Sequence, residues 1–287
     1  MAATVAGAPA ARKADGWEAA PFMPIFEASG AIMNVRLVRL ISGSREGLPE
    51  GFPDFRDELR YLKERHGEKI AALDDSSGTL LGSVSLSPDR DVGGHFFRLA
   101  AIDVSRRGLE EGVEAALLEE AKAFISQRHM SRMKLGTSPL LTGHAALYIT
   151  RFGARYRWRE GIKMPDGRPR PYVSCECDFE DPSARPLDLT EEEVAPRSVL
   201  SWDGLRPIPR REVVYAGPLS VLLPELSAEA LGEASARDPE LLPVLWSVFH
   251  ALSVHGYDFA WFDHRDPAVS APGEPPCYYV MKSVVSL

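Results

Sequence analysis

The chain has 287 residues, which allows one large domain or two modest ones, each able to bury a core. Apolar residues make up 45% and charged residues 26% of it, values that are ordinary for a globular protein and exclude wholesale disorder. Asp and Glu total 41 against 33 Lys and Arg, a net charge of -8. A protein that binds nucleic acid through phosphates needs a basic excess, so we expect no nucleic-acid partner.

The first elements alternate between strand and helix. Residues 1–33 are rich in Ala, Pro and Gly without periodicity and are expected to be an N-terminal extension. Alternation in NVRLVRLI predicts a strand, and the apolar spacing in FRDELRYLKERHG predicts a helix capped by Asp54 and ended by Gly67. Two runs that flank the turn Ser76-Ser77-Gly78, and a third run, HFFRLAAIDV, predict a three-stranded meander.

A second helix is predicted from about Glu111 to Arg128, because its apolar residues form one stripe and acidic residues stand at its start. The strand RMKLGTSP follows, then a short helix over 143–152 and a hairpin of ARYRWREGIKM and PYVSCECDF. This order of elements predicts a mixed α+β domain over residues 34–180, in which helices pack on a mixed sheet.

The acidic, Pro-rich segment 181–195 is typical of a linker, and residues 196–287 are expected to form a smaller C-terminal α+β unit. Within this unit we predict a strand at EVVYAGPL, a helical stretch at 219–235, the helix LLPVLWSVFHALSVHG, and the strands YDFAWFDH and CYYVMKSVV. A helix followed by a strand and a terminal strand echoes the first domain. A degenerate half-domain duplicate is therefore a hypothesis for this unit.

Only three cysteines occur, Cys175, Cys177 and Cys277. We interpret them as reduced thiols of a cytoplasmic protein. The Cys-Glu-Cys run lacks a second Cys/His pair at ligand spacing, His250 and His255 are five residues apart on one helix, and His264 stands beyond a strand. We therefore expect no metal site.

Neither membrane insertion nor secretion is expected. No apolar run approaches the roughly 18 residues of a membrane span. The first residues, MAATVAGAPAARK, lack a charged region ahead of an apolar core.

The stretch RLAAIDVSRRGLEEGVEAALLEEAKAF, followed by RMKLGTSPLLTGHAALYITRFGARY, resembles part of the GNAT superfamily of acyl-CoA-dependent N-acyltransferases. The order of elements over residues 34–180 is similar to that family too, so the resemblance covers about half of the chain. It implies a GNAT-like mixed sheet flanked by helices. It also implies an enzyme that moves an acyl group, expected to be acetyl, from acetyl-CoA or another acyl-CoA to an amine of a small molecule or peptide.

The resemblance places the acyl donor along the strand end Ile102, Asp103 and Val104. The loop that follows would offer backbone N–H groups to the pyrophosphate at a helix N-terminus. In the family this loop has Arg or Gln, two residues, Gly, one residue, then Gly or Ala, and only Gly112 fits that pattern here. The matching positions are Leu109, Glu110, Glu111, Gly112, Val113 and Glu114. Each carboxylate near the pyrophosphate would cost on the order of 1 kcal/mol or more when partly desolvated.

Two side chains are candidates for proton transfer. Counting four residues back from Gly153 puts Ile149 where many family members have the tyrosine that protonates the leaving thiolate, and Tyr148 stands one position earlier. A shift of one residue is about 100° around an α-helix, so Tyr148 should point elsewhere unless the helix end is remodelled, and the alternative is a half-buried aromatic that packs on the sheet. Asp103 lies in an apolar strand and is the candidate base, with a solvent-facing carboxylate as the alternative. Thr142 replaces the family's frequent asparagine.

The altered loop keeps two other hypotheses open. One is a catalytically silent GNAT-like binding module. The other is an acyltransferase that takes its thioester from an acyl carrier protein, because a phosphopantetheine arm brings no adenosine pyrophosphate. In the N-acyltransferase hypothesis, the C-terminal unit would shape the acceptor pocket or a homodimer face.

Overall fold

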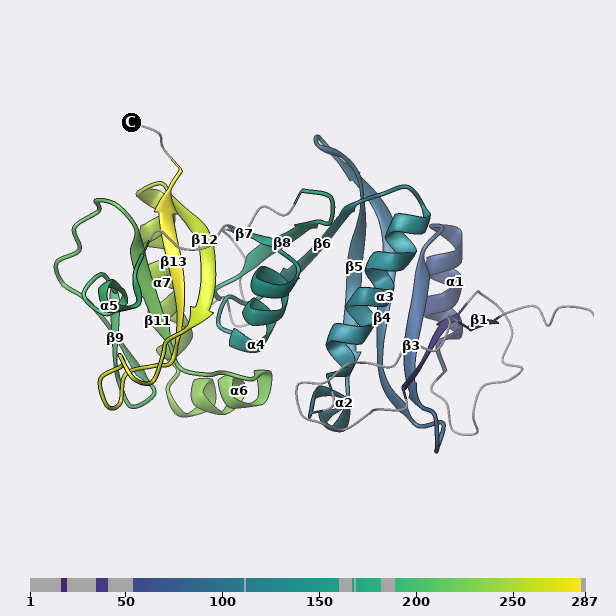
Figure 1. Cartoon of the computed structure of the whole chain (residues 1–287), viewed down its shortest axis with the longest axis horizontal. Coiled ribbons are helices and arrows are strands. Elements are labelled where there is room, and N and C mark those ends of the chain that lie inside the picture. Colours follow the sequence, from purple (N-terminus) through teal and green to yellow (C-terminus); the bar gives the residue numbers. More distant parts are fainter. Residues whose placement is uncertain are drawn as a thin grey trace, which may run out of the picture. The chain divides into compact units, whose positions relative to one another are not determined.

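The computed structural model describes residues 17–19, 35–40, 54–110, 112–159, 167, 169–181 and 189–284 (Figure 1). These residues form two compact units. The first takes its residues from 1–89 and 99–124, and the second from 90–98 and 125–287. Compactness therefore groups residues 125–180 with the C-terminal residues, and the domain division at 34–180 and 196–287 stays a prediction.

The strands of the main sheet follow the order β1-β2-β3-β4-β5-β6-β8-β7. They are β1 (Trp17–Ala19), β2 (Val35–Leu40), β3 (Glu68–Asp74), β4 (Leu80–Asp91), β5 (Gly94–Val104), β6 (Arg132–Thr137), β7 (Arg155–Trp158) and β8 (Val173–Asp178). β2 pairs antiparallel with β3, whereas β5 pairs in parallel with β6 at Phe97–Met133 and Arg98–Lys134. The predicted mixed sheet with flanking helices is confirmed.

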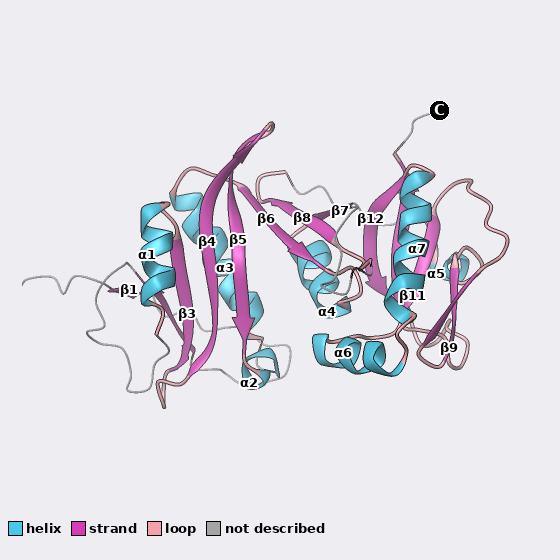
Figure 2. Ribbon diagram, turned by 180° about the vertical axis from the view of Figure 1, so that it is seen from behind, coloured by secondary structure: helices cyan, strands magenta, loops and turns pink. Residues whose placement is uncertain are grey.

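In the first unit, alternate residues of the strands face two different helices. α1 (Arg56–Glu64) covers one face, where Phe55 and Leu59 pack with Val38. α3 (Val113–Gln127) covers the other face, where Arg39 pairs with Glu120. Figures 1 and 2 view the molecule from opposite sides, and α3 lies in front of the strands in the first view and behind them in the second.

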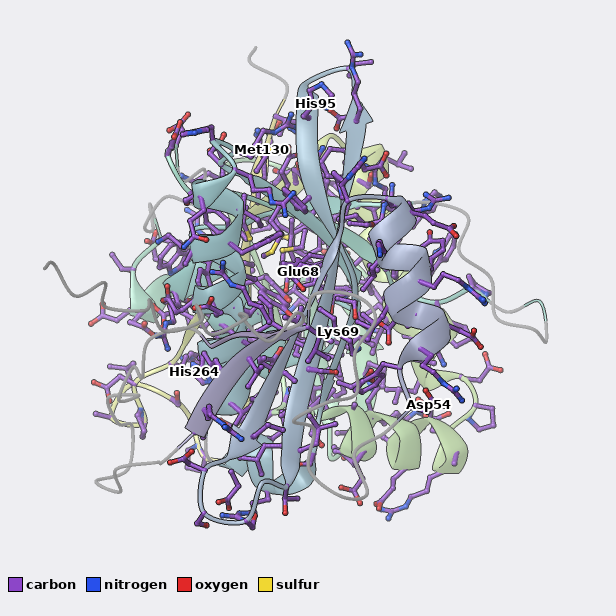
Figure 3. The ribbon with its side chains drawn as sticks, turned by 90° about the vertical axis from the view of Figure 1, so that its right-hand side faces the viewer. Asp54, Glu68, Lys69, His95, Met130 and His264 are labelled. Atoms are coloured by element: carbon purple, nitrogen blue, oxygen red, sulfur yellow. The ribbon has the colours of Figure 1, made fainter. Side chains whose placement is uncertain are left out.

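The face below α1 also holds a buried lysine. Lys69, labelled in Figure 3, donates from Nζ to Glu58 Oε1 (3.0 Å) and to Ser85 Oγ (3.0 Å). Its ammonium also lies 4.2 Å from the centre of the Phe55 ring. The charge is thus paired inside the α1 layer, as a buried charge has to be.

The turn after α1 differs from the predicted one. The helix ends at Glu64, and the residue in the left-handed region is His66 (φ 56°), where the sequence pointed to Gly67. Gly67 instead allows the chain to pass close to β4, because a Cβ there would lie 2.4 Å from the carbonyl oxygen of Leu86. Its N–H still closes the helix by donating to Leu62 O (2.8 Å).

The second unit continues through short helices into a three-stranded sheet of order β11-β13-β12. Its further elements are α4 (Thr142–Ala145), the π-helix η1 (Ala146–Arg151), α5 (Glu191–Val194), β9 (Leu200–Asp203), β10 (Arg206–Pro209), β11 (Leu219–Leu223), α6 (Ala228–Arg237), α7 (Leu241–Val254), β12 (Tyr257–His264) and β13 (Cys277–Ser283). The predicted helix and strands at 241–283 are confirmed.

The strand predicted at EVVYAGPL is wrong, and so is the start of the helical stretch at 219. Residues 212–218 belong to no strand, and β11 begins at Leu219. All five residues of β11 are buried, so the run has apolar side chains on both faces and lacks the alternation of a half-buried strand. Such a continuous apolar run does not differ in periodicity from a buried helix.

The C-terminal sheet repeats the connectivity of the segment before it. β6, a helical segment, β7 and β8 form antiparallel pairs in the order β6-β8-β7, and β11, two helices, β12 and β13 form antiparallel pairs in the order β11-β13-β12. The two motifs meet where β7 and β12 lie side by side (Figure 1). There Tyr156 contacts the Phe259 ring at 5.9 Å, and Thr150 Oγ1 donates to Phe262 O (3.2 Å). A duplicated half-domain stays a hypothesis of origin, and this is the connectivity it would produce.

The buried Arg39–Glu120 pair gives a stability prediction. Its atoms are 2.5 Å apart, and only 10% and 8% of the two side chains are exposed. Glu120→Ala leaves a buried guanidinium without its carboxylate, so we expect the free energy of unfolding in urea to fall by about 3–5 kcal/mol. Glu233→Ala, which removes an exposed helix partner of Arg237, is the matched control and should cost less than about 1 kcal/mol. Equal losses in the two variants would contradict the assignment.

Candidate functional site

The end of β5 packs against β4 at a glycine, Gly82. Ile102 and Val104 are half-buried, and Asp103 between them is exposed. Below them, a Cβ at Gly82 of β4 would lie 2.9 Å from Asp103 O and 3.2 Å from Leu117 Cδ1 of α3. Gly82 therefore lets the strand end and α3 approach β4 closely.

A short helix, α2 (Arg106–Glu110), occupies the first part of the predicted loop. It begins where Ser105 N donates to Leu81 O (2.8 Å) and Ser105 Oγ accepts from Gly108 N (3.1 Å). A Cβ at Gly108 would lie 2.6 Å from Leu81 O and 2.8 Å from Val104 Cγ1. Glycine at this position allows α2 to pack directly on the strand ends.

An ion pair ties α2 to the turn after β3. Arg107 Nη2 lies 2.6 Å from Asp74 Oδ2, and Asp74 Oδ1 accepts from the backbone N–H groups of Ser76 (2.9 Å) and Ser77 (3.1 Å). The hydrogen bond from the Ser76 hydroxyl, and these backbone and guanidinium donors, hold the pKa of Asp74 well below its usual range. No pattern in the sequence marks this pair, which spans two separate elements.

Gly112 separates α2 from α3. Its φ is 73°, in the left-handed region that favours glycine, and a Cβ there would have no neighbour within 4 Å. The next residue, Val113, is fully buried and starts α3, and Leu109 before the turn is 55% exposed. Glu114 is half-buried in the first turn of α3, the backbone alone is described for Glu110, and Glu111 lies outside the described residues.

Comparison with known proteins finds likeness in backbone arrangement alone. No family model matches the chain, and no curated protein does. Solved structures that it resembles include IAA acetyltransferase from Bacillus cereus ATCC 14579, at 19% identity over 50% of this chain and 99% of that one, with a TM-score of 0.35. A GNAT family acetyltransferase from Elizabethkingia anophelis with acetyl-CoA bound matches at 17% identity over 50% and 98% of the two chains, with a TM-score of 0.35. An acetyltransferase of the GNAT family from Staphylococcus aureus Mu50 matches at 12% over 44% and 76%, with a TM-score of 0.33. At these scores the likeness says nothing about activity.

The chain's own topology agrees with the resemblance seen in the sequence. α3 leads from β5 to β6, the two strands pair in parallel, and β8 inserts between β6 and β7. The fold is GNAT-like. Within the described part of this GNAT-like chain, no helix has the length and apolar character that crossing a membrane requires.

Tyr148 of the GNAT-like fold lies in a π-helical turn. Phe152 N donates to Leu147 O (3.3 Å), a spacing of five residues where an α-helix has four. Gly153 N, however, donates to Ile149 O (3.0 Å), the four-residue spacing of an α-helix. Ile149 therefore keeps the place that counting back from Gly153 gave it, and Tyr148 stands one residue earlier. Its side chain is fully buried, with the His144 ring 5.6 Å away.

The two candidate proton-transfer residues belong to different units. Asp103 is in the first unit and Tyr148 in the second. The donor-site residues Ile102, Val104, Gly112 and Val113 all lie in the first unit, where β4, α2 and α3 hold them. The strand end and the α3 start are thus built by one unit of the GNAT-like fold.

Two basic side chains of β6 pair with carboxylates of β4 and β8. Arg132 Nη2 lies 2.5 Å from Glu176 Oε1, and Lys134 Nζ lies 2.5 Å from Asp91 Oδ2. Glu176 also lies 3.1 Å from Lys134 Nζ. These cations hold the charged faces of β6, β8 and the β4 end together.

The Asp74–Arg107 pair gives a pH prediction. Because the pKa of Asp74 is lowered on folding, its stabilising contribution is present above the usual aspartate pKa of about 4 and is lost as the pH falls towards the folded value. We expect Asp74→Asn to lower the urea midpoint at pH 7, and the gap from the parent chain to narrow below about pH 4. Asp75→Asn, at an exposed neighbour 3.8 Å from Arg36, should leave the midpoint nearly unchanged. A gap that stays constant down to pH 2.5 would exclude this role for Asp74.

Proposed function

We propose that the chain is an N-acyltransferase that moves an acyl group, expected to be acetyl, from acyl-CoA to an amine of a small molecule or peptide. The observation that carries the proposal is the β5–α2–α3 junction, where a half-buried strand end leads through left-handed Gly112 into a 15-residue helix. The N–H groups of a helix start attract an anion such as pyrophosphate.

Asp103 and Tyr148 are the residues proposed to move protons. The amine nitrogen attacks the thioester carbonyl carbon, the C–N bond forms, and the C–S bond breaks. Exposed Asp103 would accept the proton that the amine loses, and Tyr148 would give a proton to the leaving sulfur. A backbone N–H near Val104 would stabilise the oxyanion, with most of the rate coming from positioning of the two reactants.

The acidic α3 start favours a second candidate, a thioester carried by an acyl carrier protein. Glu114 lies in the first turn of α3, and Arg107 of α2 is paired with Asp74. Negative charge at this place opposes the pyrophosphate of CoA but not an uncharged pantetheine arm. The full burial of Tyr148 is in turn the observation that favours a silent binding module.

Charge at Gly112 provides the binding test. Asn and Asp both tolerate the left-handed region, so Gly112→Asn and Gly112→Asp differ mainly by one negative charge. We expect Gly112→Asp to weaken binding of acetyl-CoA at least about tenfold relative to Gly112→Asn, measured by isothermal titration calorimetry. Gly204→Asp, at an exposed turn with φ 59° and no neighbour within 4 Å of a Cβ, is the matched control and should bind like the parent.

The same titrations separate the candidates. Saturable binding of acetyl-CoA supports the CoA donor, and its absence at millimolar concentration excludes it. Product formed from an acyl carrier protein and an amine, without binding of free CoA, supports the carrier route. Binding without turnover for any donor and amine pair supports the silent module.

Tyr148 is tested by removal of its hydroxyl. If it protonates the leaving thiolate, Tyr148→Phe should lower kcat about 100-fold or more while KM stays within about twofold. Tyr156→Phe is the matched control, because Tyr156 is also buried and its hydroxyl has no hydrogen-bond partner among the residues that the structure describes. Steady-state kinetics with an active donor and amine pair measure both. An unchanged kcat in Tyr148→Phe would exclude Tyr148 as the proton donor and show that it only packs in the core.

A further inference from the structure

Three side chains able to bind a metal ion converge at one end of the C-terminal sheet. Glu225 follows β11 by two residues, His264 is the last residue of β12, and Cys277 is the first residue of β13. His264 and Cys277 are register partners, and Cys277 also pairs with Leu223 on its other side. One nitrogen, sulfur or oxygen atom from each of the three lies within 4.8 Å of the others, and Figure 3 labels His264.

The three side chains combine a buried anchor with open access. Cys277 is fully buried, whereas 46% of the His264 side chain and 73% of the Glu225 side chain are exposed. An ion bound to these two exposed side chains would have solvent on one side and the buried sulfur on the other. Zinc binds thiolate sulfur, imidazole nitrogen and carboxylate oxygen. It takes four ligands, so three from the protein leave the fourth position for water.

A fourth residue orients the thiol. Thr142 is 3% exposed, and its hydroxyl oxygen accepts from Leu226 N (3.0 Å) while the hydroxyl hydrogen bonds to the Cys277 sulfur. Such a donor favours the thiolate form, which binds metals. Burial and the nearby Glu225 carboxylate nevertheless raise the pKa of Cys277 to about 12. A cation between Cys277 and Glu225 would stabilise the thiolate against both effects.

The topologically equivalent half of the unit provides an internal comparison. There, Trp158 at the end of β7 pairs with Val173 at the start of β8, and Val173 also pairs with Thr137 at the end of β6. Trp158 and Val173 stand where the C-terminal half has His264 and Cys277, and two residues after β6 comes Pro139, in the place of Glu225. None of these three offers a metal ligand, so the shared connectivity does not by itself produce the cluster.

We propose that Glu225, His264 and Cys277 bind one zinc ion, with water as the remaining ligand. The ion would link the ends of β11, β12 and β13, and through Thr142 it would also hold the start of α4. This proposal is independent of the acyl-transfer function, because all of its residues lie in the C-terminal sheet or contact it.

Cobalt(II) titration of the untagged, chelator-treated full chain tests the site. We expect one equivalent to bind with a thiolate-to-cobalt charge-transfer band in the near ultraviolet, and zinc to displace it. Cys277→Ser should remove the band, and His264→Gln or Glu225→Gln should weaken binding about tenfold or more. Cys175→Ser is the matched control, since this thiol is also buried and free but belongs to the other half.

Two results would overturn the proposal. One is the lack of stoichiometric binding by the parent chain at micromolar metal. The other is a charge-transfer band that persists in Cys277→Ser or disappears equally in Cys175→Ser. If Cys277→Ser fails to fold in a thermal melt, the exposed His264 and Glu225 variants decide: unchanged affinity in both excludes the site.

Discussion

Close approach of α2 and α3 to the ends of β4 and β5 is the constraint on which the candidate donor site depends. Two glycines make it possible, since a Cβ at Gly82 or Gly108 would lie within 3 Å of a backbone oxygen. α2 packs on the strand ends and is held there by the ion pair between Arg107 and Asp74. α3 then begins directly after the left-handed turn at Gly112. The position of the α3 start relative to Ile102–Val104 thus follows from two glycines and one ion pair. It does not require the loop residues that are usual in the GNAT superfamily.

The second unit uses one connectivity twice, to different effect. In the first half, β6 has a parallel neighbour in β5. In the second half, β11 is flanked on its outer side by Val199 N donating to Ser220 O (3.0 Å) and by the Trp202 indole donating to Leu222 O (2.7 Å). These bonds occupy backbone oxygens of β11 with groups of the chain itself. The second half therefore differs chemically from a donor site, and its distinctive residues are the zinc-ligand candidates at the strand ends.

An aromatic layer joins the two halves. Trp158 of β7 stacks on Phe249 of α7 at 5.8 Å, and Phe259 of β12 meets Tyr279 at 5.0 Å. Tyr279 also reaches back, donating from its hydroxyl to Pro139 O (2.7 Å), which follows β6. Because each half contributes rings to this layer, the C-terminal strands complete the packing of the segment that carries Tyr148.

Most of the helices and strands of this protein follow from its local sequence. Period-two runs at β7 and β8 and the apolar stripe of α3 gave the correct element types, and Gly112 marked its own turn, since local periodicity and backbone freedom belong to a few neighbouring residues. The sequence did not locate β11, whose fully buried run has no period, nor the left-handed residue at His66, which was sought at the neighbouring glycine.

Only the tertiary structure decided the contacts that give the sites their chemistry. Arg107 lies beside Asp74, and Glu225 and His264 lie beside Cys277, although these residues are far apart along the chain. Such pairings depend on strand register and on which small residues let elements approach. Both are set by the packing of whole layers, which no short window of sequence contains.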